Sequence, residues 1–177
     1  MGTNIWNTLS SSRDGLLTTS YADDYIVRGN AFKVNDFFDV AGGASISFTL
    51  DPTALTSDQF VFILPITIQS SEERVEFRIY ENTDYTGGAV KQYYNANRNF
   101  PDSYDFVVHQ GTSGTTEGTE LQKHVVFASS QGINESSGQG GSSNALILNT
   151  DYVYLFEITN LGSGSTTVEY DTTIYQI

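Results

Sequence analysis

Two histidines are the first candidates for a chemical role in this 177-residue chain. His109 and His124 lie on strand-like segments, 104–110 and 121–128, about equally far from the middle of the loop between them. If the two segments form a hairpin, the imidazoles could face each other as half of a metal site or as a pH-sensitive contact. Catalytic zinc usually takes three protein ligands, and no third ligand is near in sequence. We therefore interpret both as ordinary strand histidines and predict no metal ligand.

The carboxylates are numerous but scattered. The chain holds 21 Asp and Glu against 8 Lys and Arg, which gives a formal net charge of −13. Asp23-Asp24 and Glu72-Glu73 are sequence neighbours rather than a spaced pair, although carboxylates that cleave a glycosidic bond need to converge only in three dimensions. Asp84 and Asp102 lie in loops that could bind calcium, but EF-hand spacing is absent. Such an acidic excess is more typical of solubility than of catalysis.

No nucleophile is set up for catalysis either. The chain has no cysteine, which excludes disulfides and thiol chemistry. The segment GTSGTTEG (111–118) lacks the Gly-Lys-Ser/Thr of a phosphate-binding loop and the Gly-x-Ser-x-Gly spacing of a nucleophile elbow. We expect it to be a hairpin tip. The sequence thus predicts a protein that is not an enzyme, with no catalytic residue and no cofactor.

The stretch YYNANRNFPDSYDF (93–106) is the most distinctive polar run. Asparagine tolerates left-handed backbone conformations and caps turns with its side chain. Arginine can fork onto backbone carbonyls or a carboxylate. We predict a structural turn whose side chains hold neighbouring loops in place, and a contact with a partner is left open. The residues of this turn are Asn95, Asn97, Arg98 and Asn99.

Tyrosines gather around this turn and the one before it, and we expect them to be exposed. Tyrosine is favoured at interfaces because it offers a large rigid face with a polar end, so a protein or carbohydrate contact surface is one interpretation. Cross-strand aromatic pairing within the sheet is the other. The group comprises Tyr80, Tyr85, Tyr93, Tyr94 and Tyr104, of which Tyr93 and Tyr94 are candidate partner contacts.

The elements that must position these residues are strands. Apolar residues alternate with polar ones in 44–50 and 74–80, as in half-buried strands, and a continuous apolar run fills 59–69. Turn signals separate the segments at short intervals, and a Gly/Ser-rich surface loop spans 129–144. We predict an all-β fold, an antiparallel two-sheet β-sandwich of jelly-roll-like type with eight to nine strands and no helix. Residues 31–177 form this single domain.

Residues 1–30 differ from the rest, since their large apolar residues follow no clean period. We predict an N-terminal arm or lead-in strand that packs on the domain or on a neighbouring molecule. Its candidate partner contacts are Trp6, Leu9, Leu16 and Leu17. The segment lacks the pattern of a signal peptide, and no apolar run approaches the length of a membrane span.

Charge also restricts the partners. The few basic residues are scattered, whereas nucleic-acid affinity rests largely on neutralising phosphates, so we expect no binding to DNA or RNA. The same negative charge opposes binding to anionic membranes.

The order of motifs from Glu81 to Gln176 resembles a group of tailed-bacteriophage proteins, the small β-sandwich head decoration or cement proteins. The resemblance rests on the turn from Asn95 to Asn99, followed shortly by Pro101-Asp102-Ser103, and on four later features. These are Gly118-Thr119-Glu120-Leu121, a Gly-rich loop (132–143), the unit from Leu148 through Tyr152 to Asn160, and a final strand. The match covers a little over half of the chain, and residues 1–80 agree only in strand character.

The resemblance implies a non-enzymatic structural virion protein that binds and stabilises the outer surface of a phage capsid. Its partners would be the major capsid protein and neighbouring copies of itself, with a homo-oligomer possible. It would be assembled in the bacterial host cytoplasm, a reducing compartment in which disulfides are rare. The alternative is a carbohydrate- or receptor-binding β-sandwich module on a virion or cell surface.

Overall fold

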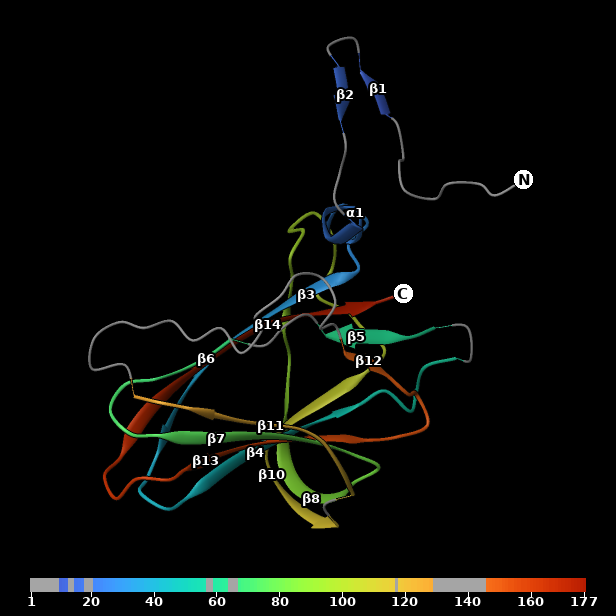
Figure 1. The fold of residues 1–177 in the computed structure, drawn as a ribbon. Coiled ribbons are helices and arrows are strands. Elements are labelled where there is room, and N and C mark those ends of the chain that lie inside the picture. The colour runs from blue at the N-terminus through green and yellow to red at the C-terminus, as the bar shows by residue number, and fades with distance from the viewer. Residues whose placement is uncertain are drawn as a thin grey trace.

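The computed structural model describes residues 10–12, 15–17, 21–56, 59–63, 67–116, 118–128 and 146–177. Two antiparallel sheets pack face to face (Figure 1). The prediction of an all-β, two-sheet sandwich is confirmed. The strands outnumber the eight or nine expected, partly because the apolar run 59–69 contributes two short strands instead of one.

The first sheet has six strands in the order β11 (Thr119–Val126), β7 (Val75–Glu81), β13 (Tyr154–Asn160), β4 (Ser45–Asp51), β10 (Val107–Thr116) and β8 (Asp84–Lys91). The second runs β12 (Leu146–Leu148), β5 (Val61–Ile63), β14 (Thr166–Gln176), β3 (Ala31–Val40) and β9 (Tyr94–Asn95). Its sixth strand, β6 (Thr67–Ser70), also pairs with β14.

The core lies between the sheets and follows from the two-residue period of the strands. In β3, every second side chain from Phe32 to Val40 is buried while those between are exposed. Aromatic rings fill the centre: Phe48 stacks on Phe156 with ring centroids 4.8 Å apart, and Tyr170 meets Phe48 edge-on. Full burial of a large apolar side chain contributes about 1.5–3 kcal/mol, so this core accounts for much of the stability.

β7–β8 and β10–β11 together form one long, sharply bent ribbon. β8 pairs with β10 and β7 pairs with β11, in a register that continues across the bend with two shifts of the kind made by β-bulges. Bulges bend a strand and increase its twist. The predicted hairpin of 104–110 with 121–128 is therefore wrong, because the chain turns a corner between β10 and β11 instead of reversing.

The corner separates the two histidines. His109 lies between Thr49 and Val90 in the sheet, and its Nδ1 is 3.1 Å from the Tyr85 hydroxyl. His124 lies beside Phe77 on the other arm of the ribbon. The expectation that the imidazoles could face each other is thus overturned.

The bent ribbon also covers part of the outer side of its own sheet. Leu155 points away from the main core, yet its side chain is buried, and a Cβ built on Gly114 would lie 3.0 Å from it. Ser47, also on the outer side, donates a hydrogen bond to the Thr112 carbonyl. The curl of the ribbon thus covers these two outer side chains.

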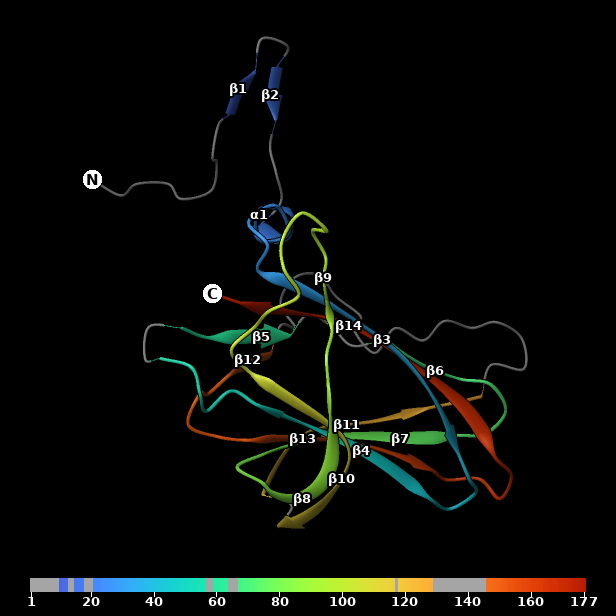
Figure 2. The same cartoon turned by 180° about the vertical axis from the view of Figure 1, so that it is seen from behind.

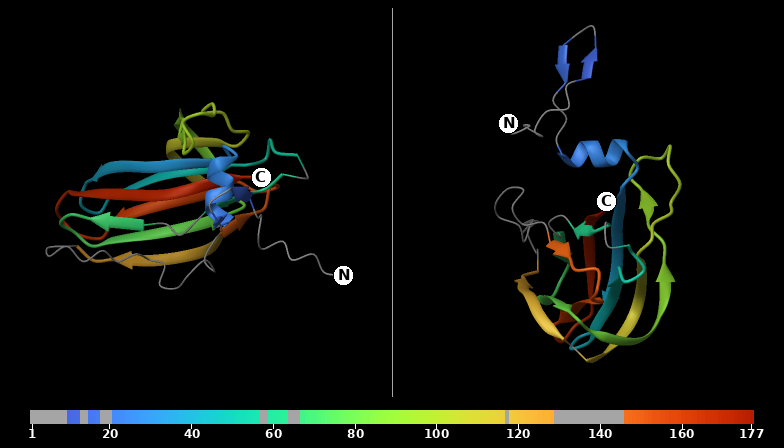
Figure 3. Two further views of the ribbon diagram at one scale, coloured as in Figure 1. Left: turned by 90° about the horizontal axis from the view of Figure 1, so that it is seen from above. Right: turned by 90° about the vertical axis from the view of Figure 1, so that its right-hand side faces the viewer.

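The N-terminal segment contains a hairpin and a short helix. Among the described residues, the strands β1 (Ser10–Ser12) and β2 (Gly15–Leu17) pair only with each other, and helix α1 (Tyr21–Val27) follows them. Figure 3 shows the hairpin on the far side of α1 from the sheets. Within the described part of the chain, no helix is long and apolar enough to cross a membrane.

Helix α1 contradicts the expectation of a chain without helices. Its first turn carries Asp23 and Asp24, which interact favourably with the positive helix N-terminus, and Asp24 pairs with Arg28 at 2.9 Å. With seven residues it is too short to display a helical period. Of the predicted arm contacts, Trp6 and Leu9 lie outside the described residues. Leu16 and Leu17 lie in β2, where only the backbone is described.

Candidate functional site at the base of the N-terminal segment

The Asn-rich turn lies against the end of α1, at the point where the N-terminal segment joins the sandwich. It follows β9, which pairs with the start of β3 so that Asn95 stands opposite Phe32. Figure 2 shows the loop after β9 beside the helix. Residues separated by almost seventy positions in sequence are thereby brought together.

Asn95 is the centre of this junction. Its buried side-chain amide donates to the Gly29 carbonyl at 2.6 Å and to the Pro101 carbonyl at 3.3 Å. Its Oδ1 accepts a hydrogen bond from the Asn97 N–H at 2.9 Å, and its own N–H donates to Asp102 Oδ1 at 2.7 Å. The side chain and main-chain N–H of Asn95 thus connect the turn to the loop that follows it and to the residues after α1.

Asn97 extends the junction to the helix itself. Its side-chain amide donates to the carbonyl of Val27, the last residue of α1, at 3.1 Å. Carbonyls at a helix C-terminus have no partner within the helix, so this bond satisfies one of them. The other end of the Asn97 amide, Oδ1, accepts from the main-chain and side-chain N–H groups of Asn99, both at 3.1 Å.

Arg98 lies on the outer surface of the turn. Its guanidinium donates to Asp102 Oδ1 at 2.7 Å and lies 5.3 Å from the centre of the Tyr94 ring. The Asn95 N–H, and after it Arg98, hold the pKa of Asp102 below its ordinary value. All four residues predicted for this turn therefore lie in it, and three of them bind groups outside it through their side chains.

Tyr93 and Tyr94 have opposite environments because successive residues of an extended chain point to opposite sides. Tyr94 is 66% exposed, whereas Tyr93 is only 5% exposed. The Tyr93 hydroxyl donates to Asp36 Oδ2 at 3.3 Å, and burial raises the pKa of Tyr93 far above its ordinary value. The expectation of an exposed Tyr93 is wrong, so this side chain is not available as a surface contact.

The neighbouring tyrosines mostly serve packing. Tyr80 is buried and accepts a hydrogen bond from Arg78 at 3.1 Å. Tyr104 stacks on Phe106 with ring centroids 4.2 Å apart, and its hydroxyl donates to the Lys91 carbonyl at 3.1 Å. Burial favours packing for Tyr80 and Tyr104, but the ring contacts of Tyr104, with Phe106 and Phe32, are not the predicted pairs of opposite residues in two strands.

An exposed patch surrounds the turn, and we call it the anchor patch: Val27, Tyr94, Arg98 and Phe100. Its members come from the helix end, β9 and the turn. Phe100 lies so close to the backbone that a Cβ on Gly29 would be 2.3 Å from the ring. Val27 and Phe100 were not among the predicted contacts. Phe100 stands inside the quoted polar run, but Val27 required knowledge of α1.

Acidic residues elsewhere in the described part of the chain make structural contacts and form no metal site. In the described ranges, no group of three or more His, Asp or Glu side chains could hold a metal ion. Several acids make structural contacts: Glu73 accepts a hydrogen bond from the Gly164 N–H at 2.9 Å, and Asp24 pairs with Arg28. The junction of turn and helix joins segments far apart in the sequence through several side-chain hydrogen bonds.

Comparisons with known proteins add no relative: no protein-family model, no curated protein and no solved structure matches the chain.

Proposed function

We propose that the protein is a non-enzymatic structural protein that binds and stabilises the outer surface of a phage capsid. The observation that carries the proposal is the anchored base of the N-terminal segment. Side chains of the Asn-rich turn hold the end of α1 and the residues that follow it, whereas the hairpin before α1 pairs with neither sheet. A firmly held base with an unpaired extension suits a segment that attaches to another molecule.

The extension needs a partner for its own stability. An isolated two-stranded hairpin is marginally stable in water and gains stability from a further strand or from packing on an apolar surface. The first twenty residues carry apolar side chains that would take part, namely Trp6, Leu9, Leu16 and Leu17. Strand addition to a neighbouring subunit is one recurring way for such a segment to bind.

The anchor patch would extend the contact surface. Aromatic residues and arginine are enriched at protein interfaces and among the residues that dominate binding energy. Tyr94 and Phe100 offer exposed aromatic surface there, and the Arg98 guanidinium, 5.3 Å from the centre of the Tyr94 ring, would support that ring. The partners would be the major capsid protein and neighbouring copies of this chain, and the location would be the head surface of the virion.

Cosedimentation with expanded capsids that lack the protein tests the proposal. The intact chain should bind saturably and should be found with heads and not with tails. A variant with Trp6→Ala and Leu9→Ala should bind more weakly while its sandwich unfolds at an unchanged temperature. An intact chain that shows no affinity for expanded capsids would overturn the proposal.

A second candidate is carbohydrate binding, favoured by the exposed ring of Tyr94 beside the Asn-rich turn. Sugar sites combine apolar surface with a few well-placed polar groups, and the anchor patch offers both. A glycan array on which no sugar binds would exclude this candidate. Binding that survives Tyr94→Ser would place a sugar site elsewhere.

A further inference from the structure

The outer face of the second sheet carries a groove that the proposed function does not use. It has a volume of ≈ 240 Å³ and lies over β6, β14 and β3. Its lining is polar apart from one aromatic ring: Phe37, Gln69, Ser70, Ser71, Thr167 and Glu169. Phe37 faces outward because its neighbours in β3 point into the core, and it is 63% exposed.

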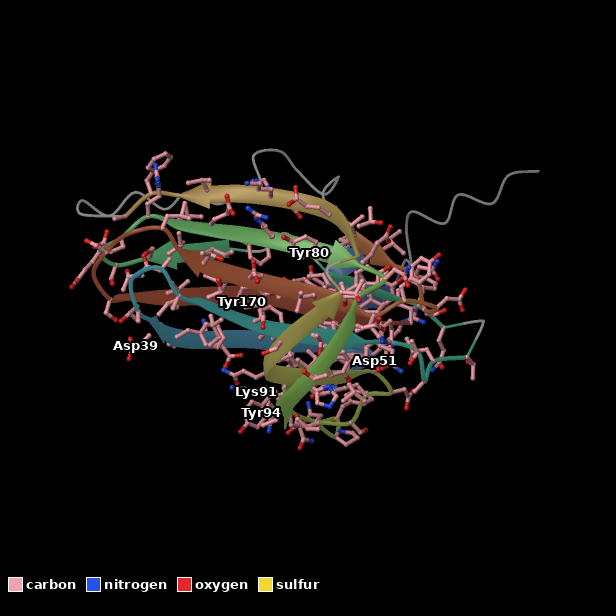
Figure 4. The ribbon with its side chains drawn as sticks, turned by 90° about the horizontal axis from the view of Figure 1, so that it is seen from below. Asp39, Asp51, Tyr80, Lys91, Tyr94 and Tyr170 are labelled. Atoms are coloured by element: carbon pink, nitrogen blue, oxygen red, sulfur yellow. The ribbon has the colours of Figure 1, made fainter. Side chains whose placement is uncertain are left out.

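The strand register places carboxylates around this ring. Glu169 lies directly opposite Phe37 in β14, and Gln69 lies opposite Glu169 in β6. Asp39, labelled in Figure 4, is two residues further along β3. The alternation of side chains along the strand therefore puts it on the same face as Phe37. The aromatic ring therefore has one acidic side chain opposite it in β14 and a second one two residues along its own strand.

Both carboxylates are oriented by a neighbouring polar side chain. The Asn35 amide donates to Glu169 Oε1 at 3.2 Å, and the Thr167 hydroxyl donates to Asp39 Oδ1 at 2.7 Å. Neither carboxylate forms an ion pair with a lysine or arginine of the described ranges. Held in place and not neutralised, they complement a positive charge located above Phe37.

We propose that this groove binds a guanidinium group, presented as an arginine side chain on a basic segment of a partner protein. Arginine stacks on aromatic faces and at the same time donates to carboxylates through its planar fork. The guanidinium would stack on Phe37 and donate to Glu169, which lines the groove, and to Asp39, which lies next to it on β3. A neutral ligand such as a sugar would leave both charges uncompensated.

The net charge of the whole chain also favours a basic partner. A net charge of −13 attracts basic segments and raises their rate of encounter at low ionic strength. The inference does not rest on capsid attachment, since the groove belongs to the sheet face and not to the N-terminal segment.

A nuclear magnetic resonance titration of the ¹⁵N-labelled full chain tests it. The probe is the peptide acetyl-Gly-Arg-Gly-Arg-Gly-amide, compared with the same peptide carrying neutral citrulline in place of arginine. The arginine peptide should give saturable shifts of the amides around Phe37, Thr167 and Glu169. The citrulline peptide should give none. Equal shifts with both peptides would overturn the inference.

Variants separate a specific site from general attraction to an acidic protein. Glu169→Gln should weaken binding by about tenfold, which is about 1.4 kcal/mol, because the guanidinium loses its hydrogen bond to a charged acceptor. Phe37→Ser should also weaken it. Asp84→Asn on β8 removes the same charge from an exposed position in the other sheet and should leave the dissociation constant within about twofold.

Two further results would overturn the inference. One is an equal loss of affinity for Glu169→Gln and Asp84→Asn, which would mean unspecific attraction. The other is binding of the neutral sugar maltotriose at the same amides with no binding of the arginine peptide, which would mean a carbohydrate site. Retained thermal unfolding temperatures of the variants would confirm that the fold is intact in each comparison.

Discussion

The side-chain amide of Asn95 donates a 2.6 Å hydrogen bond to the carbonyl of Gly29, which lies 66 residues earlier in the chain. This bond joins the polar turn after β9 to the residues that connect α1 with β3. Because Asn95 is buried, water cannot replace the bond if the side chain is removed. Asn95 thus helps to hold the N-terminal segment on the sandwich, together with Asn97 and the ring contact between Tyr25 and Tyr175.

Replacing Asn95 with alanine should therefore destabilise the protein by about 1–3 kcal/mol, the usual cost of leaving buried polar groups without partners. The amides of α1 should also exchange with solvent faster, since the turn no longer holds the helix end. Urea unfolding and amide hydrogen exchange measure the two effects. Asn99→Ala is the control: that side chain is exposed, so its effect should stay within about 0.5 kcal/mol. Equal effects of the two substitutions would contradict the role given to Asn95.

Arg98→Ala should lower thermal stability more than it lowers capsid binding. The substitution removes the bond to Asp102 in the following loop and the contact with Tyr94 of β9, both of which are contacts inside this protein and not with a partner. Arg98→Lys keeps the charge but not the planar fork, so its unfolding temperature should fall between those of the parent and the alanine variant. Thermal unfolding and capsid cosedimentation give the two readings. Full stability with lost binding would instead make Arg98 a contact residue.

The sequence predicted the parts of the fold that depend on local pattern. Alternation of apolar and polar residues located β4 and β7, and turn chemistry located the polar run around Asn97. It could not decide how strands pair. A Gly-rich stretch between two strands reads the same whether the chain reverses or turns a corner, and Gly118 turns out to mark a corner. Pairing is settled by long-range packing that no local window contains.

The sequence also could not show which residues of the polar run are buried. Tyr93 and Tyr94 are identical neighbours, and only the direction of β9 relative to β3 decides which of them faces Asp36. The groove at Phe37 needed the register of three strands, because Glu169 and Gln69 are distant in sequence from that ring and from each other. The sequence therefore indicated which residue types lie on a strand, but not which residues of other strands they contact.

The corner of the ribbon gives a prediction at Gly118. Its φ is +72°, and a Cβ there would lie 2.1 Å from the Glu81 carbonyl oxygen, a backbone atom of the paired strand. Gly118→Ala should therefore cost more than about 3 kcal/mol, since strain at positive φ adds to the clash. Gly43 has a φ of +70° but open space around it. Gly43→Ala should accordingly cost only about 1–2 kcal/mol. Chemical unfolding measures both, and similar losses would mean that the corner relaxes without cost.

An ion pair between the sheets gives a further prediction. Lys91 Nζ of β8 lies 2.6 Å from Asp36 Oδ1 of β3, and Asp36 is nearly buried. Lys91→Met should cost about 2 kcal/mol, because it leaves a buried carboxylate without its cation. Adding Asp36→Asn should restore part of this loss, since the amide oxygen still accepts from Tyr93. A double-mutant cycle by urea unfolding measures the coupling. Additive losses would show that the pair does not link the two sheets energetically.

The charged cluster on the outer side of β7 predicts a pH dependence. Glu76 receives a 2.9 Å contact from Lys123 Nζ and a 2.6 Å hydrogen bond from Arg78. The bond from Lys123 is the main cause that lowers the pKa of Glu76 from 4.5, while partial burial opposes it and Arg78 lowers it further. A carboxylate whose pKa is lower in the folded chain stabilises the fold above its unfolded pKa and loses that effect as the pH falls through the folded value. The parent should thus be more stable than Glu76→Gln above pH 4.5, and the difference should vanish on acidification below that value.

Glu120→Gln is the matched control, because Glu120 meets Arg78 only at 3.7 Å and is more exposed, so it should change stability little at either pH. Urea unfolding across the acid range measures the three proteins, and a Glu76→Gln difference that persists at low pH would assign the loss to packing and not to charge.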